Sequence, residues 1–146
     1  MKIEMKRVHG YELASKGDRL VAAIVRSIII LMAFILIYTV LGTPISEVLN
    51  SDADLTDMLF GIIQSLILGA IFYPLFIGNI GHKIFGLKVI SVENGEDFKK
   101  YDEGALREAL KNLSGYLIIP NIWILWDEKN QNLYDKLTKT YVVKKH

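Results

Sequence analysis

The fold of this chain is decided by two apolar stretches, residues 20–41 (LVAAIVRSIIILMAFILIYTVL) and residues 58–80 (MLFGIIQSLILGAIFYPLFIGNI). The first carries one charge, at Arg26, and the second carries none. At ~1.5 Å of rise per helical residue, each is long enough for the ~30 Å hydrocarbon core of a bilayer. The sequence therefore predicts two membrane-spanning helices. We expect the first to be retained rather than cleaved as a signal peptide, because a long polar segment precedes it.

The composition supports a membrane protein and argues against several other classes. The 146 residues are 51% hydrophobic and carry a formal net charge of +1. There is no cysteine, which excludes disulfides, thiolate zinc sites and cysteine nucleophiles. A net charge near zero gives no electrostatic attraction to nucleic acid, so no nucleic-acid partner is expected. The length fits one domain, residues 1–146.

Charges on either side of the two stretches predict their orientation. Residues 1–19 are basic, and Lys and Arg return after residue 81, whereas residues 42–57 contain neither. That connection holds four acidic residues, Glu47, Asp52, Asp54 and Asp57. Lys and Arg favour the cytoplasmic side of a membrane. We therefore expect a cytoplasmic N-terminus and a short acidic outer loop.

Residues 81–101 are predicted to hold a cytoplasmic strand and turn. Residues 85–93 (FGLKVISVE) are rich in β-branched side chains, and Asn94-Gly95 is typical of a tight turn. A second short strand is predicted at residues 140–143 (TYVV). The two strands can pair only if both lie on the same side of the membrane. We expect a small β-hairpin or strand pair here.

Residues 102–126 are predicted to form an amphipathic helix followed by a broken apolar segment. Apolar residues recur at helical spacing from Ala105 to Leu113. The opposite face carries Arg107, Glu108, Lys111 and Asn112. Such a helix is expected to lie at the membrane interface, with its polar face in water.

The broken segment, residues 113–126, has two possible arrangements. It is uncharged, but it is short for a span and Pro120 interrupts it. It either crosses the membrane or re-enters it from the cytoplasmic side. We favour re-entry, because it keeps the basic tail, residues 127–146, in the cytoplasm.

Arg19, Arg26 and Asp135 are the candidate functional residues. Arg19 and Arg26 share a helix face because they are seven residues apart. An ionisable group inside a span usually faces protein or water, so Arg26 should face the interior. It either lies on an ion or ligand pathway, or snorkels to the interface or pairs with Asp135 or Asp18. Asp135 either pairs with one of the two arginines or caps a solvated turn.

The second apolar stretch contains a row of small residues, Gly61, Ser65 and Gly69. Small residues four apart let helix backbones approach closely. The partner of this face is expected to be the first helix or another copy of the chain. Two or three spans bury little surface between themselves, so we also expect an oligomer.

The sequence predicts no catalytic, cofactor or metal site. Residues 81–88 (GHKIFGLK) have the glycine spacing of a P-loop, but Lys and Ser or Thr do not follow the second glycine. The three histidines are scattered without metal-ligand spacing. We therefore expect no enzyme activity and no cofactor.

Three segments resemble those of the RDD family of small integral membrane proteins. Residues 14–30 (ASKGDRLVAAIVRSIII) look like its first-helix signature, and residues 78–98 (GNIGHKIFGLKVISVENGEDF) are similar to its Gly-Lys and Gly-Leu-x-Val segment. Residues 125–143 (LWDEKNQNLYDKLTKTYVV) resemble its closing motif. The resemblance places the name-giving Arg at Arg19 and the final Asp at Asp135. The family's first-helix Asp falls on Arg26, so a carboxylate is replaced by a guanidinium.

The resemblance implies a multi-pass protein of a prokaryotic cytoplasmic membrane, in a family where small-ligand transport or cation–proton exchange is suspected for some members. Together with the charge inside a span, it leads to our first hypothesis, transport of a small ligand or ion. Arg19, Arg26 and Asp135 would form a polar cluster at the cytoplasmic end. The alternative hypothesis is a scaffold or accessory subunit that binds a partner membrane protein through the Gly61, Ser65 and Gly69 face.

Overall fold

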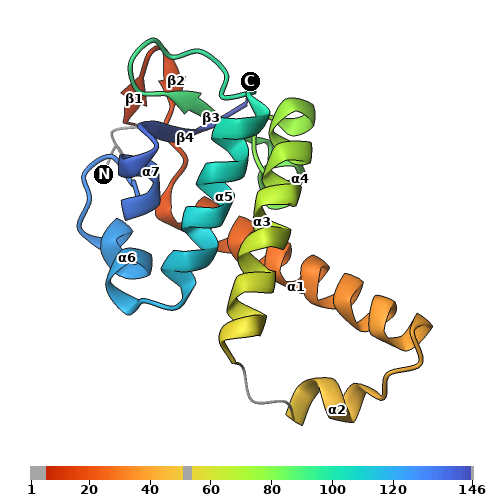
Figure 1. Ribbon diagram of the computed structural model, residues 1–146. Helices are drawn as coiled ribbons and strands as arrows, with labels where there is room; N and C mark the ends of the chain where they lie inside the picture. Colours follow the sequence, from red (N-terminus) through yellow and green to blue (C-terminus); the bar gives the residue numbers. More distant parts are fainter. Residues whose placement is uncertain (1–5, 51–53, 146) are drawn as a thin grey trace.

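A computed structural model describes residues 6–50 and 54–145 of the chain (Figure 1). Asp52 of the acidic connection lies outside the described residues. In chain order the elements are β1 (Arg7–Val8), β2 (Tyr11–Glu12), α1 (Lys16–Val40), α2 (Ile45–Asn50), α3 (Leu55–Phe76), α4 (Ile80–Ile84), β3 (Leu87–Ser91), α5 (Tyr101–Gly115), α6 (Ile118–Ile122), the 3-10 helix Trp123–Leu125, α7 (Leu133–Leu137) and β4 (Thr140–Lys144).

Both long helices begin at reciprocal caps that the sequence provides. At the start of α1, the hydroxyl of Ser15 accepts a hydrogen bond from the backbone N–H of Asp18 at 3.0 Å, and the Asp18 carboxylate accepts one from the N–H of Ser15. Asp54 and Asp57 form the same arrangement at the start of α3. Such capping boxes satisfy backbone donors that a helix start leaves unpaired.

The second apolar stretch is interrupted near its end. Pro74 lies in the last turn of α3, and Ile77 adopts a left-handed conformation with φ 60°. Asn79 then caps α4, where Gly81 packs so closely on α1 that a Cβ there would lie 2.2 Å from the carbonyl oxygen of Ala22. Residues 58–80 are therefore not one continuous helix, because the chain turns to bring α4 against α1.

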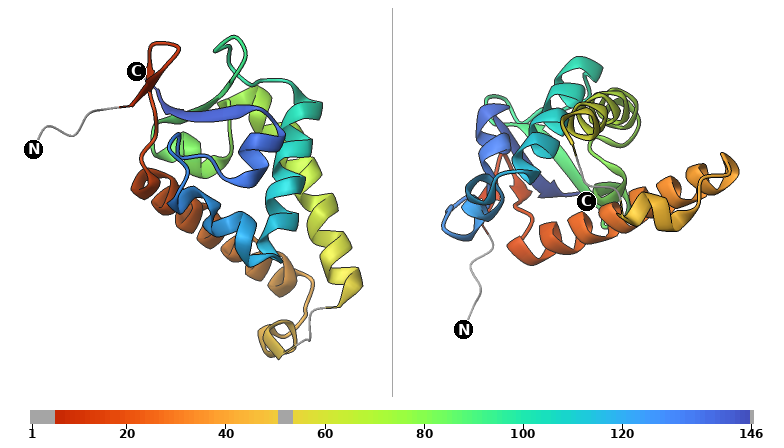
Figure 2. Two further views of the ribbon diagram at one scale, coloured as in Figure 1. Left: turned by 90° about the vertical axis from the view of Figure 1, so that its left-hand side faces the viewer. Right: turned by 60° about the horizontal axis from the view of Figure 1, so that its bottom comes forward.

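Helix α5 runs beside α3, whereas α1 is inclined to both (Figures 1 and 2). The orientation of α5 about its own axis differs from the one that the sequence predicts. Arg107 and Glu108 are fully buried, while the apolar side chains of Leu106 and Leu113 are 54% and 41% exposed. The polar face turns inward because its charges find partners on α1, α3 and α7. The face we expected in water is therefore the interior face.

The small residues of α3 form the contact with α5. Ser65 is buried, and a Cβ on Gly69 would lie 2.4 Å from the backbone carbonyl oxygen of Gly104. Gly61 lies opposite Asn112 of α5 and Tyr116, the residue that follows this helix. The structure thus places this face against α5, rather than against α1 or a second copy of the chain.

Strands β3 and β4 pair antiparallel, from Leu87 opposite Lys144 to Ser91 opposite Thr140. This confirms the strand pair that the sequence predicts. A hairpin that we did not predict, β1 with β2, turns at His9-Gly10, both with positive φ, and joins β4 through a bridge between Leu13 and Val143 (Figure 2). Residues near the two ends of the chain therefore meet at one end of the molecule.

The broken apolar segment forms short turns rather than a long helix. Pro120 lies within the five-residue helix α6, and a 3-10 helix follows at once. Of the residues that the structure describes, only α1 and the region from Leu55 to Ile84 are helical, long and apolar enough to cross a membrane. After α6 the chain returns to α7 and β4 (Figure 1).

Candidate functional site

A set of polar side chains, most of them buried and the others half-buried, connects the long helices to α5 and α7. We call it the buried charge cluster. It consists of Arg19 and Arg26 from α1, Tyr73 from α3, Asn79 before α4, Arg107, Glu108 and Lys111 from α5, and Asp135 from α7. It contains all three candidate residues of the sequence analysis and five that the sequence analysis did not assign to a site.

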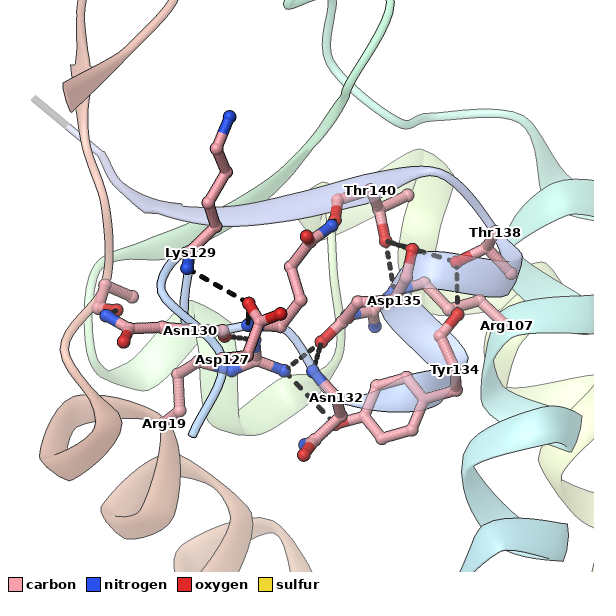
Figure 3. Close-up of polar contacts among 12 residues, drawn as sticks. Arg19, Arg107, Asp127, Lys129, Asn130, Asn132, Tyr134, Asp135, Thr138 and Thr140 are labelled. Atoms are coloured by element: carbon pink, nitrogen blue, oxygen red, sulfur yellow. Dashed lines mark hydrogen bonds and ion pairs between the residues drawn. The ribbon is translucent and has the colours of Figure 1, made fainter. Parts of the chain in front are cut away.

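Asp135 lies between two arginines (Figure 3). Its Oδ2 lies 2.5 Å from Nη2 of Arg19 and accepts a hydrogen bond from the backbone N–H of Asn132 at 2.8 Å. Its Oδ1 forms an ion pair with Arg107. Burial would raise the pKa of Asp135, but the guanidinium groups of Arg19 and Arg107 hold it below its ordinary value. Asp135 is therefore ionised and joins the first helix to α5.

Arg107 connects three elements from a fully buried position. Its Nε donates to Oγ1 of Thr140 on β4 at 3.2 Å, and its Nη1 donates to the hydroxyl of Tyr73 on α3. The guanidinium also lies over the ring of Tyr134, 5.2 Å from its centroid. A planar guanidinium can make these directional contacts at once, whereas a lysine ammonium could not.

Glu108 is the partner of Arg26. The Nη2 of Arg26 lies 2.7 Å from Oε2 of Glu108, while Oε1 accepts hydrogen bonds from the Tyr73 hydroxyl at 3.1 Å and the Asn79 side chain at 3.2 Å. Burial opposes ionisation, but Lys111, Arg26 and Arg107 hold the pKa of Glu108 far below its ordinary value.

This geometry decides among the pairings that we considered for Arg26. The arginine faces the interior as expected, with a side chain that is 16% exposed, but it pairs with Glu108 rather than with Asp135 or Asp18. The carboxylate of Asp18 instead caps α1.

A cavity of about 250 Å³ adjoins the cluster. Its lining includes the polar side chains of Arg19, Asn79, His82 and Lys111 and the apolar side chains of Leu20, Ala23 and Ile124. His82 is 5% exposed, and its Nδ1 has no hydrogen-bond partner among the residues that the structure describes. Among the described residues, no group of three or more His, Asp or Glu side chains could hold a metal ion.

The chain has two long apolar helices, and buried charges join them to a small region that contains the β1–β2 and β3–β4 pairs. These features indicate a helical membrane protein. The chain belongs to the RDD family, whose family model matches residues 13–139 and so covers most of its length. This confirms the resemblance seen in three segments of the sequence. No curated protein and no solved structure shows significant similarity to the chain.

Proposed function

We propose that this protein is a multi-pass protein of a prokaryotic cytoplasmic membrane, with both termini and the β3–β4 pair in the cytoplasm. The excess of Lys and Arg outside residues 42–57 supports this orientation. The pairing of β3 with β4 requires the intervening chain to begin and end on one side of the membrane. Residues 113–126 then re-enter or lie against the membrane surface rather than crossing it.

Cysteine labelling tests this topology in a chain that has no cysteine of its own. We expect a membrane-impermeant maleimide to label Glu47→Cys in intact cells, because Glu47 is exposed in the outer connection. Lys145→Cys, which is exposed beside β4, should be labelled only after the membrane is permeabilised. Labelling of Lys145→Cys in intact cells would contradict the proposed topology.

We propose further that the protein transports a small ligand or ion, with the buried charge cluster at the cytoplasmic end of its path. The observation that carries this proposal is a cavity that adjoins a cluster of four cationic and two anionic side chains. Ionisable groups inside membrane helices, where we place Arg26, are costly and commonly mark substrate pathways. The Arg19–Asp135 and Arg26–Glu108 ion pairs also stabilise the fold. Their side chains would therefore line the path in fixed positions.

A flux measurement tests the transport proposal. Proteoliposomes should take up at least one of labelled sodium, rubidium, acetate or phosphate faster than protein-free vesicles. Arg26→Gln should reduce that flux at least tenfold, while Lys100→Gln, which removes an exposed lysine before α5, should not change it. Flux at the wild-type rate through a folded Arg26→Gln protein would remove Arg26 from the path, and no flux of any probe would contradict transport.

The scaffold alternative requires a surface other than the one we first assigned to it. Helix α5 covers Ser65 and Gly69, so a partner could reach them only by displacing α5. The exposed apolar surface of α1, which includes Ile28, Leu31 and Leu36, is available instead. We propose that lipid chains cover it, and that in the scaffold alternative a partner membrane protein would replace them.

A further inference from the structure

The buried charge cluster carries more positive than negative charge. Its cations are Arg19, Arg26, Arg107 and Lys111, and its carboxylates are Glu108 and Asp135. Arg19 and Arg107 pair with Asp135, and Arg26 pairs with Glu108. Among the described residues, Lys111 has no hydrogen-bond or ion-pair partner. Glu108 attracts the ammonium electrostatically, but the cluster still holds two more cations than carboxylates. Because excess charge away from water is unfavourable, a bound anion would be favoured here.

The cavity lies where such an anion could reach Lys111. Lys111 lines it together with Arg19, Asn79 and His82. His82 is almost completely buried, yet its ring makes no hydrogen bond with any described residue. The volume, about 250 Å³, is below the ~300–1,000 Å³ of pockets for drug-sized ligands, which suits an ion or a headgroup.

We propose that this cavity binds a phosphate-type oxyanion, either free in the cytoplasm or as the headgroup of an anionic lipid, with Lys111 as its main ligand. The inference rests on the proposed function, since it names the chemical class of the transported or regulating ligand. Arg19 adds positive potential, and His82 supplies a ring nitrogen from the same lining. The apolar side chains of Leu20, Ala23 and Ile124, which also line the cavity, would contact the part of a lipid next to its phosphate.

The ionisation of Lys111 agrees with this site. Burial lowers the pKa of Lys111 to about 7, and the nearby Arg26, Arg107 and Arg19 lower it against the opposing effect of Glu108. The other titratable groups that line the cavity are Lys16 and Arg19 from α1, His82 from α4 and Tyr134 from α7. Below this pKa the ammonium is charged and an anion is favoured, and above it the neutral amine attracts an anion weakly.

The same shift predicts how stability depends on pH without the anion. Between about pH 7 and the ordinary lysine pKa of 10.5, the unfolded chain binds more protons at Lys111 than the folded chain. Stability should therefore rise with pH across this window. Lys111→Gln removes the buried charge, so in anion-free buffer its melting temperature should exceed that of the wild type at pH 6.5, and the gap should close towards pH 10.

Binding by the full-length protein tests the site. The soluble probe is inorganic sulfate, which keeps its charge across the pH range used, and it is added at constant ionic strength to protein in mild detergent. The lipid probe is phosphatidylglycerol, compared with phosphatidylcholine in nanodiscs. We expect one of the two probes to raise the melting temperature at pH 6.5 in a saturable way. The dissociation constant of that probe should be at least tenfold higher at pH 8.5.

Three variants complete the test. Lys111→Gln should weaken binding of the effective probe at least tenfold, whereas the control Lys100→Gln should not. Lys111→Arg keeps its charge at every pH used, so its affinity for the effective probe should be the same at pH 6.5 and pH 8.5. An effect of sulfate identifies a soluble anion, and an effect of phosphatidylglycerol alone identifies a lipid.

The anion site is overturned if neither probe stabilises the protein, or if Lys111→Gln binds like the wild type. Its failure can be distinguished from that of transport. Specific anion binding without any flux would leave the site in place and contradict transport. Flux that is unaffected by Lys111→Gln, with no anion binding, would support transport and contradict the anion site.

Discussion

Asp135→Asn is expected to destabilise the folded protein by about 3–5 kcal/mol, because it leaves two buried guanidinium groups without their shared counter-charge. Asparagine has nearly the same shape, so the loss reflects charge rather than packing. The amide could still accept one hydrogen bond from Arg19 or Arg107, but its Nδ2 would face donors. Unfolding of both proteins in mild detergent, followed by circular dichroism, measures the difference.

The matched control is Glu93→Gln, which makes the same chemical change at an exposed ion pair with Lys139. Exposed pairs contribute about 0–1 kcal/mol, so this variant should unfold close to the wild type. The pKa of Asp135 is lowered on folding, so its contribution is complete above the ordinary value of 3.8 and is lost as pH falls through the folded value. The gap between wild type and Asp135→Asn should therefore narrow only in strong acid. Equal stability of Asp135→Asn and Glu93→Gln at pH 7 would contradict the central role of Asp135.

The parts of the fold that the sequence predicts best are those governed by local patterns. Two runs of apolar residues indicate the two long helices, and β-branched runs indicate β3 and β4. The sequence predicts the pairing of β3 with β4 only on the condition that both strands lie on the same side of the membrane. The β1–β2 hairpin was missed, although Gly10 after His9 is a turn signal, because its strands have two residues each.

The orientation of α5 could not be predicted from its own sequence. Periodicity separates the face of Leu106 from that of Arg107 and Glu108, but it does not say which face is inside. In water the apolar face turns inward, whereas beside a membrane the apolar face can meet lipid. The partners that draw Arg107 and Glu108 inward, Tyr73 and Asp135 among them, lie at least 28 residues away in the chain. Only tertiary structure brings them together.

The same reasoning accounts for the arginine that replaces the family's first-helix carboxylate. Arg26 pairs with Glu108, and the Asn79 side chain and the Tyr73 hydroxyl complete the contacts of that carboxylate. A guanidinium is accommodated at this position because α5 supplies the opposite charge. An aspartate at residue 26 would face Glu108 and repel it. Sequence alone showed the reversal of charge, but the compensating residue lay on a helix face that we had placed in water.

Gly69→Ala is expected to destabilise the protein by about 1–3 kcal/mol, although alanine is the better helix former. A Cβ at residue 69 would lie 2.4 Å from the carbonyl oxygen of Gly104 and 2.7 Å from Cα of Ala105. Both are backbone atoms of α5, so no side-chain rotation relieves the clash. The helices must separate, which also moves Arg107 away from Tyr73. The larger Gly69→Leu change should prevent the docking of α5 altogether.

Gly61→Ala is the matched control on the same face of α3. Its Cβ would meet Asn112 and Tyr116 side chains at 3.6 Å, an ordinary contact, so the helix propensity of alanine should leave stability equal or up to about 1 kcal/mol higher. Unfolding in mild detergent should thus show different stabilities for two identical substitutions that lie eight residues apart. If both variants were equally stable, close packing of α3 on α5 would be excluded. If Gly69→Ala instead remained folded but lost an oligomer, the face would serve a second copy of the chain, because that contact would then lie between molecules.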